Sequence, residues 1–335
     1  MKAIQVSKSG GPLELVEREI PAVKRDWVRI RVQACGVCHS DMMMKEGYWP
    51  GLQYPRVPGH EVAGIIDELG ENVTVWKKGQ RVGVGWYGGH CGVCEPCRRG
   101  ELACCLVGPI TGFTYDGGYT EYMLAPAQSL AAMPDHLSPE EAAPLMCAGL
   151  TTYNALRNSG ARPGDVVAIQ GIGGLGHLAV QYAAKFGYRT VALGRGNDAR
   201  DLALKLGAQA YIDSESANPV EELQKMGGAK VIVSTAPSGK AMATVFDGLG
   251  VLGKLMVIGA ANDPLEVSPG QFITGKRSVQ GWVAGTSIDS EDTLRFSAMS
   301  GVRPMIEKYP LARAAEAYDR MLSGHAKFRV VLMMD

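Results

Sequence analysis

The sequence predicts an α/β protein made of a β-rich domain and a doubly wound domain built on a parallel sheet. The chain has 335 residues, more than one ordinary hydrophobic core accommodates, which indicates two domains. Residues 1–150 contain short apolar segments broken by glycine and proline, as in a compact β domain. We expect the β domain at residues 1–150, the doubly wound domain at 151–284, and a return of residues 285–335 to the first domain.

A few segments carry the periodicity on which this expectation depends. Val28–Val32 alternates apolar and polar residues, as a half-buried strand does. In the second half, Val166–Ile169 and Val231–Val233 are short apolar runs of the kind that form buried parallel strands. A helical stretch at Leu178–Phe186 lies between them, and alternation of strand and helix is typical of a doubly wound sheet.

The overall composition limits the kinds of partner. Hydrophobic residues make up 46% of the chain and charged residues 20%, and the formal net charge is zero, which argues against nucleic acid or an anionic membrane surface as a partner. The N-terminus has no signal-peptide pattern, and no apolar stretch reaches about 18 residues. We expect a cytoplasmic protein that binds small molecules.

Four cysteines stand close together in one short segment. Cys91, Cys94 and Cys97 are spaced at intervals of three residues and Cys105 follows, with Cys104 as the competing fourth candidate. This spacing lets one loop wrap a tetrahedral zinc ion, with Zn–S bonds of about 2.3 Å. Four thiolates leave no open coordination position, so we expect a structural zinc ion in this four-cysteine site. Redox-active disulfides and a coincidental cluster are the alternatives.

Three further candidate ligands, Cys38, His60 and Cys147, are dispersed along the chain. A catalytic zinc ion needs three protein ligands and one open position, which two thiolates and one imidazole satisfy. We call this group the mixed-ligand site. Each residue alone would prove little, because a lone buried cysteine is usually a small hydrophobic residue. We interpret Cys35 in that way, as a core residue.

A glycine motif follows the apolar run that begins at Val166. The pattern GxGxxG between a predicted strand and a helix starting at His177 is typical of a dinucleotide-binding turn. We expect Gly171 to permit the tight turn, Gly173 to let a pyrophosphate approach the backbone, and Gly176 to allow close helix–strand packing. The alternative is a turn of the same shape that binds nothing.

The preference between NAD and NADP depends on the end of the next predicted strand. An acidic residue about twenty positions after the motif would bind the adenosine ribose 2′-hydroxyl. That place holds Gly194, followed by Arg195, and no carboxylate appears before Asp198. Glycine exerts no repulsion on a 2′-phosphate, and Arg195 could pair with one. The sequence therefore favours NADP over NAD, with a solvated surface role for Arg195 as the alternative.

Together, these motifs resemble the zinc-containing alcohol dehydrogenases of the medium-chain dehydrogenase/reductase superfamily. The resemblance covers essentially the whole chain, and the length is similar to the tetrameric microbial branch. It implies a GroES-like catalytic domain, a Rossmann domain and a homotetramer or homodimer. It also implies hydride transfer between a nicotinamide dinucleotide and a primary alcohol/aldehyde pair. The motifs that carry it are Cys38-His39-Ser40-Asp41, Gly59-His60-Glu61, the four-cysteine site, Cys147 and the glycine motif.

The resemblance also implies roles for individual residues around the catalytic zinc. The mixed-ligand site would hold that ion, with Glu61 close behind it and joining it in some states, and Cys104 would be a bystander of the structural ion. Asp41 would hydrogen-bond His60 and fix its tautomer. Ser40 would accept the proton of the alcohol.

Cofactor and substrate positions follow from the same resemblance. His39 and Arg329 match positions that contact the pyrophosphate, and Trp49 and Trp86 match aromatic walls of the substrate pocket, with core packing as the alternative. The full set of residues implied to contact the dinucleotide is His39, Thr151, Gly171, Gly173, Gly174, Leu175, Gly176, Gly194, Arg195, Ile258, Val283 and Arg329.

One departure and several alternatives bear on this interpretation. Many family members carry a histidine that ends the proton relay at the position held here by Met43. The relay must then end through water or the cofactor ribose. The alternatives are a polyol, formaldehyde or cinnamyl-type zinc dehydrogenase, a zinc-free quinone or enoyl reductase, and a non-catalytic protein that binds zinc and dinucleotide.

Overall fold

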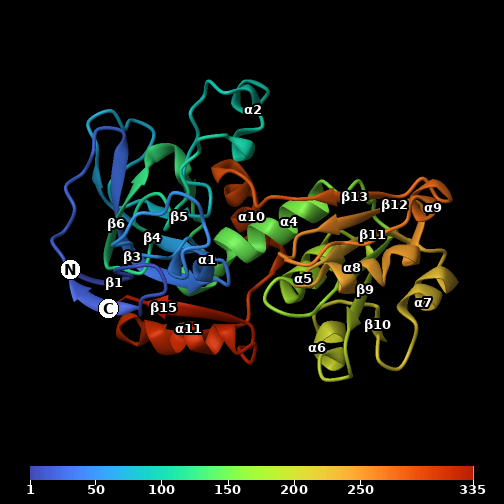
Figure 1. Cartoon of the computed structure of the whole chain (residues 1–335). Coiled ribbons are helices and arrows are strands. Elements are labelled where there is room, and N and C mark those ends of the chain that lie inside the picture. Colours follow the sequence, from blue (N-terminus) through green and yellow to red (C-terminus); the bar gives the residue numbers. More distant parts are fainter. Residues whose placement is uncertain (335) are drawn as a thin grey trace. The chain divides into compact units, whose positions relative to one another are not determined.

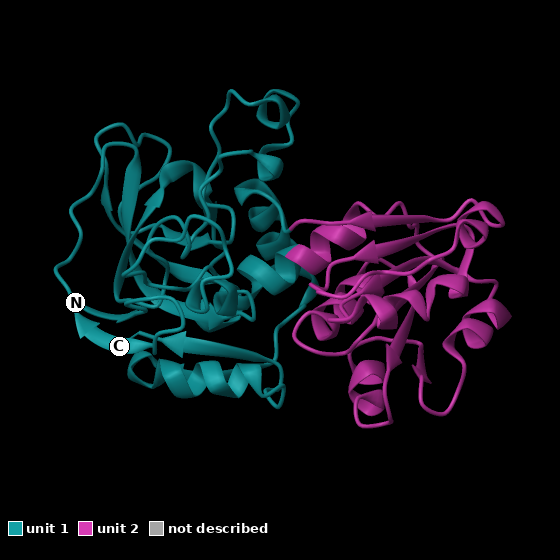
Figure 2. Ribbon diagram, viewed as in Figure 1, with its two compact units in different colours: residues 1–150, 284–335 teal, residues 151–283 magenta. Residues whose placement is uncertain are grey.

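The computed structural model describes residues 1–334 and divides them into two compact units. Unit 1 contains residues 1–150 and 284–335, and unit 2 contains residues 151–283 (Figure 2). Because each unit has its own sheet, the two are described one after the other.

Unit 1 is built on a mostly antiparallel sheet with strand order β14-β15-β3-β4-β5-β7, and β6 pairs with β3 outside that path. Apolar residues alternate inward along β3, where Val28, Ile30 and Val32 are buried, as the period of two predicts. The strands of unit 1 are β1 (Lys2–Gln5), β2 (Glu14–Glu17), β3 (Trp27–Val37), β4 (Val62–Leu69), β5 (Arg81–Val84), β6 (Tyr122–Pro126), β7 (Leu130–Ala132), β14 (Ile306–Pro310) and β15 (Arg329–Met333).

The C-terminal segment completes this sheet. β15 pairs antiparallel with β3, with Val330 opposite Val37, and parallel with β14. Figure 1 shows β15, in red, next to α11. This register places Arg329 beside the end of β3, where Cys38 follows. Arg329, which is near the end of the sequence, therefore lies close to the candidate metal ligands.

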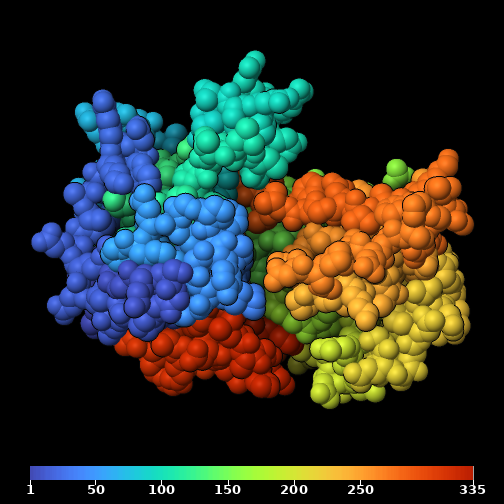
Figure 3. All heavy atoms as spheres, viewed as in Figure 1, coloured from blue at the N-terminus to red at the C-terminus, as the bar shows by residue number. Residues whose placement is uncertain are grey.

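The helices of unit 1 are short, apart from α10 and α11. The segment around α2 stands out from the body of unit 1 as a lobe in the space-filling view (Figure 3). A π-helix follows α3, and α3 begins with a capping box formed by Ser138 and Glu141. The helices are α1 (Asp41–Lys45), α2 (Glu95–Arg98), α3 (Pro139–Pro144), the π-helix (Leu145–Gly149), α10 (Ser287–Ser300) and α11 (Ala314–Leu322), with 3-10 turns at Leu102–Cys104, Ala127–Ser129 and Leu311–Arg313.

Unit 2 is a parallel six-stranded sheet with strand order β10-β9-β8-β11-β12-β13, which confirms the predicted doubly wound fold. Its strands are β8 (Val166–Gln170), β9 (Arg189–Gly194), β10 (Ala210–Asp213), β11 (Ala229–Ser234), β12 (Leu249–Val257) and β13 (Ser278–Gly281). Its helices are α4 (Leu150–Arg157), α5 (Gly176–Lys185), α6 (Arg200–Lys205), α7 (Pro219–Lys225), α8 (Gly239–Ala243) and α9 (Pro269–Ile273), with a 3-10 turn at Phe246–Gly248.

The glycine motif forms the turn between β8 and α5. Gly171 has a φ of +89°, a conformation that residues with a side chain rarely adopt. A Cβ atom at Gly176 would lie 1.8 Å from the carbonyl oxygen of Gly171, so α5 could not begin this close to the strand with any other residue. A Cβ atom at Gly173 would meet no protein atom within 4 Å. Two of the three glycines are therefore required by the fold, and Gly173 is not.

No helix found within residues 1–334 combines the length and the hydropathy needed to cross a bilayer.

Candidate functional site

The residues of the mixed-ligand site come together at one edge of the sheet in unit 1. Cys38 follows the end of β3, and His60 and Glu61 precede the start of β4. Since β3 and β4 are antiparallel neighbours, these two ends lie side by side. Cys147 reaches the same place from the π-helix, a form often found at functional positions. One ligand atom from each of Cys38, His60, Glu61 and Cys147 lies within 4.8 Å of the other three.

The imidazole of His60 is held by one carboxylate. Asp41 Oδ1 lies 3.0 Å from His60 Nδ1, and both side chains are buried. A carboxylate only accepts hydrogen bonds when ionised, so Nδ1 carries a proton, and in the neutral imidazole the lone pair is on Nε2. No hydrogen-bond partner of Nε2 is found among the described residues, although this atom is buried. Such an acceptor fits a metal ion.

The two thiols of the mixed-ligand site are hydrogen-bonded to each other. Their Sγ atoms lie 3.9 Å apart. The hydrogen bond from Cys147, followed by the nearby His60, holds the pKa of Cys38 well below its ordinary value, and the same hydrogen bond raises the pKa of Cys147. Two thiolates this close repel each other, and a bound divalent cation removes that repulsion by ligating both.

Glu61 contributes a second unsatisfied acceptor. Its Oε1 accepts a hydrogen bond in an ion pair with Arg329, and its Oε2 is buried without a partner in the described chain. Burial raises the pKa of Glu61 to about 7, although Arg329 opposes that rise. Gly36 leaves room for this carboxylate, because a Cβ atom there would lie 1.9 Å from Oε2.

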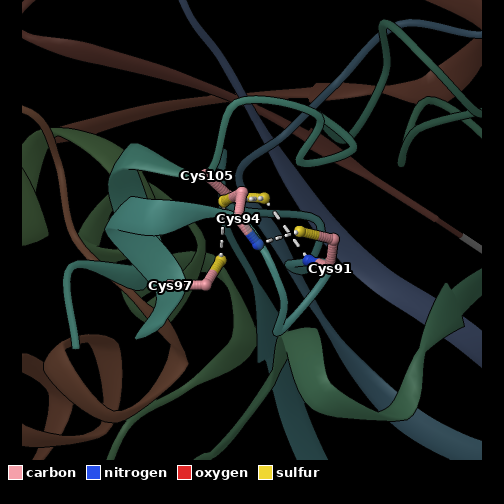
Figure 4. A group of neighbouring side chains, drawn as sticks. All are labelled: Cys91, Cys94, Cys97 and Cys105. Carbon is pink, nitrogen blue, oxygen red and sulfur yellow. Dashed lines mark hydrogen bonds between the residues drawn. The ribbon is translucent and has the colours of Figure 1, made fainter. Parts of the chain in front are cut away.

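The four-cysteine site is compact (Figure 4). The Cys94 and Cys97 sulfurs lie 3.4 Å apart, and the backbone N–H groups of Cys91 and Cys94 donate to the sulfurs of Cys105 and Cys91. A hydrogen bond from the Leu106 backbone leads the interactions that lower the pKa of Cys94 to about 6. Burial raises the pKa of Cys97 to about 12.

The ligand atoms of the four-cysteine site also lie within 4.8 Å of one another. Cys104 is exposed and stands outside this group, as the resemblance implies. Four sulfurs at this separation suit tetrahedral coordination of one zinc ion and leave no position for a substrate.

Aromatic rings surround the imidazole of His60. The ring of Trp86 lies edge-on to the ring of His60, and their centroids are 5.1 Å apart. The ring centroids of Trp49 and Trp86 are 5.7 Å apart. Phe113, which the sequence reasoning missed, lies 4.8 Å from Trp86 and is almost fully buried. Trp49 and Trp86 are half-buried and pack against an apolar cluster that includes Met44 and Phe113, so the core-packing alternative applies in part.

Three residues beside Cys38 occupy different surroundings. Ser40 Oγ lies 3.7 Å from the Cys38 sulfur and is half-buried, whereas His39 is exposed. Met43, like Trp49, packs against the apolar cluster and offers no ionisable proton. Ser40 is therefore the hydroxyl next to the mixed-ligand site.

The residues implied to contact the dinucleotide in unit 2 gather mostly at the carboxyl ends of the parallel strands. Gly171, Ile258 and Val283 follow β8, β12 and β13, and Gly194 ends β9. Ligands bind at this edge in open parallel sheets. The further members of that set are Thr151 in α4 and Gly173, Gly174, Leu175 and Gly176 in the glycine turn, with Arg195 exposed after β9. In unit 1, Arg329 pairs with Glu61 and His39 is exposed, and their contact with pyrophosphate remains a prediction.

Comparison with known proteins places both units in one family. Residues 24–135 match the alcohol dehydrogenase GroES-like domain, and residues 174–299 match the zinc-binding dehydrogenase domain. The chain is 42% identical to alcohol dehydrogenase patD of Penicillium expansum, over 98% of this chain and 96% of that one. It is 39% identical to an alcohol dehydrogenase of Geobacillus stearothermophilus, over 100% and 99% of the two chains. A solved NAD-dependent alcohol dehydrogenase superposes with a TM-score of 0.92 at 27% identity, over 100% of both chains.

The chain belongs to the zinc-containing alcohol dehydrogenases of the medium-chain dehydrogenase/reductase superfamily. It is a zinc-dependent alcohol dehydrogenase, with a structural zinc site at the four cysteines and a catalytic zinc site at Cys38, His60, Glu61 and Cys147. Membership of the family also makes NAD(P) its cofactor. The predicted family, fold class and activity are thereby confirmed, and the zinc-free reductase and the non-catalytic protein are excluded.

The four-cysteine site predicts that serine substitutions at Cys94 and at Cys104 have different effects on zinc content and stability. Cys94→Ser removes a ligand, so we expect one zinc ion per subunit in place of two and an unfolding temperature lower by several degrees, because zinc binding stabilises the fold around it. Cys104→Ser is the matched control and should keep both ions and the wild-type unfolding temperature. Metal analysis and calorimetry provide the two measurements, and equal behaviour of the two variants would contradict the assignment of ligands.

The glycine turn predicts that alanine substitutions at Gly173 and Gly176 impair the protein for different reasons. Gly173→Ala should fold normally, since its Cβ atom meets open space, yet bind the dinucleotide at least tenfold more weakly because that space lies where the pyrophosphate approaches. Gly176→Ala should lower the stability of unit 2 because of its clash with Gly171. Fluorescence titration with the reduced cofactor and chemical unfolding distinguish these outcomes. Tight binding by Gly173→Ala would be inconsistent with this turn as the pyrophosphate site.

Proposed function

We propose that this zinc-dependent alcohol dehydrogenase uses NADP and interconverts apolar or aromatic primary alcohols with their aldehydes. The observation that carries the choice of cofactor is the end of β9 and the loop that follows, where Gly194 and Arg195 stand in place of an acidic residue. The solved relative described as NAD-dependent gives no support for NADP, so the proposal depends on the surroundings of this loop.

A side chain at position 194 would clash with Tyr211. A Cβ atom there would lie 2.1 Å from the hydroxyl oxygen of Tyr211, and that hydroxyl donates a hydrogen bond of 2.7 Å to the carbonyl oxygen of Gly196. An acid at position 194 would therefore displace Tyr211 and break the bond that shapes the loop. This supports a ribose site that does not repel a 2′-phosphate.

The acidic residue that strand pairing places opposite Gly194 already has hydrogen-bond partners. Asp213 pairs with Gly194 across β9 and β10, and its Oδ1 accepts hydrogen bonds from the backbone N–H groups of Gly196 and Glu215. Ser216 donates to its Oδ2. These hydrogen bonds hold the pKa of Asp213 below its ordinary value and fix the loop. Arg195 is exposed and has no ion-pair partner within residues 1–334, so its guanidinium is available to a phosphate.

The substrate class follows from the walls of the mixed-ligand site. Trp49 and Trp86 present aromatic rings near His60, and aromatic walls favour apolar or aromatic substituents over the several hydroxyl groups of a polyol. A cinnamyl-type alcohol fits this description as well as a small aliphatic one. Formaldehyde would leave the aromatic walls without contact.

Different residues of the chain have different roles in the proposed reaction. Cys38, His60 and Cys147 would hold the catalytic zinc ion, which when bound stabilises negative charge on the substrate oxygen. Ser40 Oγ would accept the proton of the alcohol hydroxyl, and the substrate carbon would pass its hydride to the nicotinamide. Met43 cannot take the proton onward, so it would leave from Ser40 through water or the cofactor ribose.

We also propose a cytoplasmic homotetramer or homodimer. β13 is an edge strand of the parallel sheet, and an uncovered edge is prone to pairing with another chain. Val251 and Ile273, both about three-quarters exposed, are apolar side chains of the same unit. An interface between copies would cover both features.

The cofactor proposal predicts a selective effect of one arginine. Wild-type enzyme should have a lower KM for NADP than for NAD, and Arg195→Ala should raise the KM for NADP on the order of tenfold or more while changing that for NAD little, because the lost charge-assisted bond serves only the phosphate. Arg189→Ala is the matched control, since Arg189 is an exposed arginine at the opposite end of β9.

Initial rates with both cofactors over a panel of aliphatic, aromatic and polyhydric alcohols provide the measurement. A wild-type preference for NAD, or equal effects of the two arginine substitutions, would contradict the cofactor proposal. Faster turnover of polyols than of aromatic primary alcohols would contradict the substrate class.

A further inference from the structure

Tyr119 is a fully buried tyrosine whose hydroxyl lies behind the mixed-ligand site. It donates a hydrogen bond of 2.8 Å to Asp41 Oδ2, the carboxylate that orients His60 through its other oxygen. Neither the glycine motif nor the pattern of metal ligands points to it. We propose that Tyr119 is a positioning residue of the catalytic zinc site, which acts through Asp41. The proposal rests on the zinc-dependent activity and is independent of the choice between NAD and NADP.

Asp41 joins two zinc ligands, and Tyr119 completes its set of donors. Oδ2 accepts from the backbone N–H of Cys38 at 2.9 Å and from Tyr119, while Oδ1 accepts from His60 Nδ1. The carboxylate therefore receives three hydrogen bonds, of which one comes from a ligand's backbone and one from a ligand's ring. A carboxylate buried this deeply keeps one orientation only while its acceptor positions are satisfied.

The position of Tyr119 is itself fixed by the segment that carries His60. The backbone N–H of Tyr119 donates to the carbonyl oxygen of Pro58 at 3.0 Å, and Gly118 donates to Gly59 at 2.9 Å. The tyrosine ring lies against Gly59, where a Cβ atom would come within 2.4 Å of Tyr119 Cδ1. The residue before the ligand His60 must therefore be glycine for the ring to fit.

Three segments far apart in the sequence are thus joined at one hydroxyl group. Residues 38–41 supply Cys38 and Asp41, residues 58–61 supply His60 and Glu61, and residues 117–119 supply the tyrosine. Without the hydroxyl, Oδ2 keeps only the Cys38 N–H as a donor, and the carboxylate can turn away from His60. The imidazole would then lose the orientation that directs Nε2 to the metal ion.

The test compares zinc release from the holoenzyme in Tyr119→Phe and Tyr115→Phe. Phenylalanine keeps the ring that packs on Gly59, so Tyr119→Phe should retain the fold. Tyr115→Phe is the matched control, because its hydroxyl lies 2.7 Å from Thr111 Oγ1 in the same loop and does not reach Asp41. Release to a chromophoric chelator is followed for both zinc ions, and Cys94→Ser identifies the phase that belongs to the four-cysteine site.

We expect Tyr119→Phe to release zinc from the mixed-ligand site on the order of tenfold faster than wild type, with unchanged release from the four-cysteine site. Tyr115→Phe should match wild type at both sites. Cobalt(II) exchanged into the mixed-ligand site should show an altered visible absorption band in Tyr119→Phe only. In an Asp41→Asn background, Tyr119→Phe should add little, because both substitutions break the same link.

Several results would overturn the proposal. These are wild-type release by Tyr119→Phe, equal acceleration by Tyr115→Phe, and loss of both zinc ions together, which would show general loosening of the fold. Additive effects of Asp41→Asn and Tyr119→Phe would show that the tyrosine does not act through the carboxylate. Because zinc release is measured without cofactor or substrate, these results are distinguishable from a failure of the proposed NADP and substrate preferences.

Discussion

The hydrogen bond between Asp41 and His60 is the interaction on which the rest of the site depends. In the neutral imidazole it places the lone pair on Nε2, and that atom is buried without a partner in the described chain. Burial of an acceptor without a partner is unfavourable unless an ion or a solvent molecule binds to that acceptor. The same carboxylate holds the backbone of Cys38. One side chain therefore sets the position of two ligands, and the ends of β3 and β4 bring all of these residues together.

Much of the fold could be predicted from periodicity and from glycine. The alternation in β3 and the apolar runs at β8 and β11 are local features, so they are visible in the sequence. The pairing of β15 with β3 is not, since it joins residues about 300 positions apart and no local pattern specifies it. The π-helix that carries Cys147 could not be predicted either, because no local pattern in Leu145–Gly149 distinguishes it from an ordinary helix.

The candidate site also contains residues that could be predicted from the sequence and residues that could not. The metal ligands could be predicted, because cysteine and histidine in these patterns have few other roles and because the resemblance supplied their grouping. Tyr119 and Phe113 could not, since a buried aromatic residue in the sequence looks like any other core residue. Gly59 before His60 was the available clue: a glycine beside a ligand indicates that another group packs closely there. The ion pair of Glu61 with Arg329 likewise depends on the long-range strand pairing.

We infer that the mixed-ligand site holds the zinc ion that turnover requires, whereas the dinucleotide binds independently of it. The most direct measurement combines zinc content, cofactor affinity and turnover in Cys38→Ala. We expect one zinc ion per subunit in place of two, cofactor binding close to that of wild type, and turnover lower by at least a thousandfold, or about 4 kcal/mol in activation free energy. Wild-type-like turnover by this variant would contradict a catalytic role for this zinc ion.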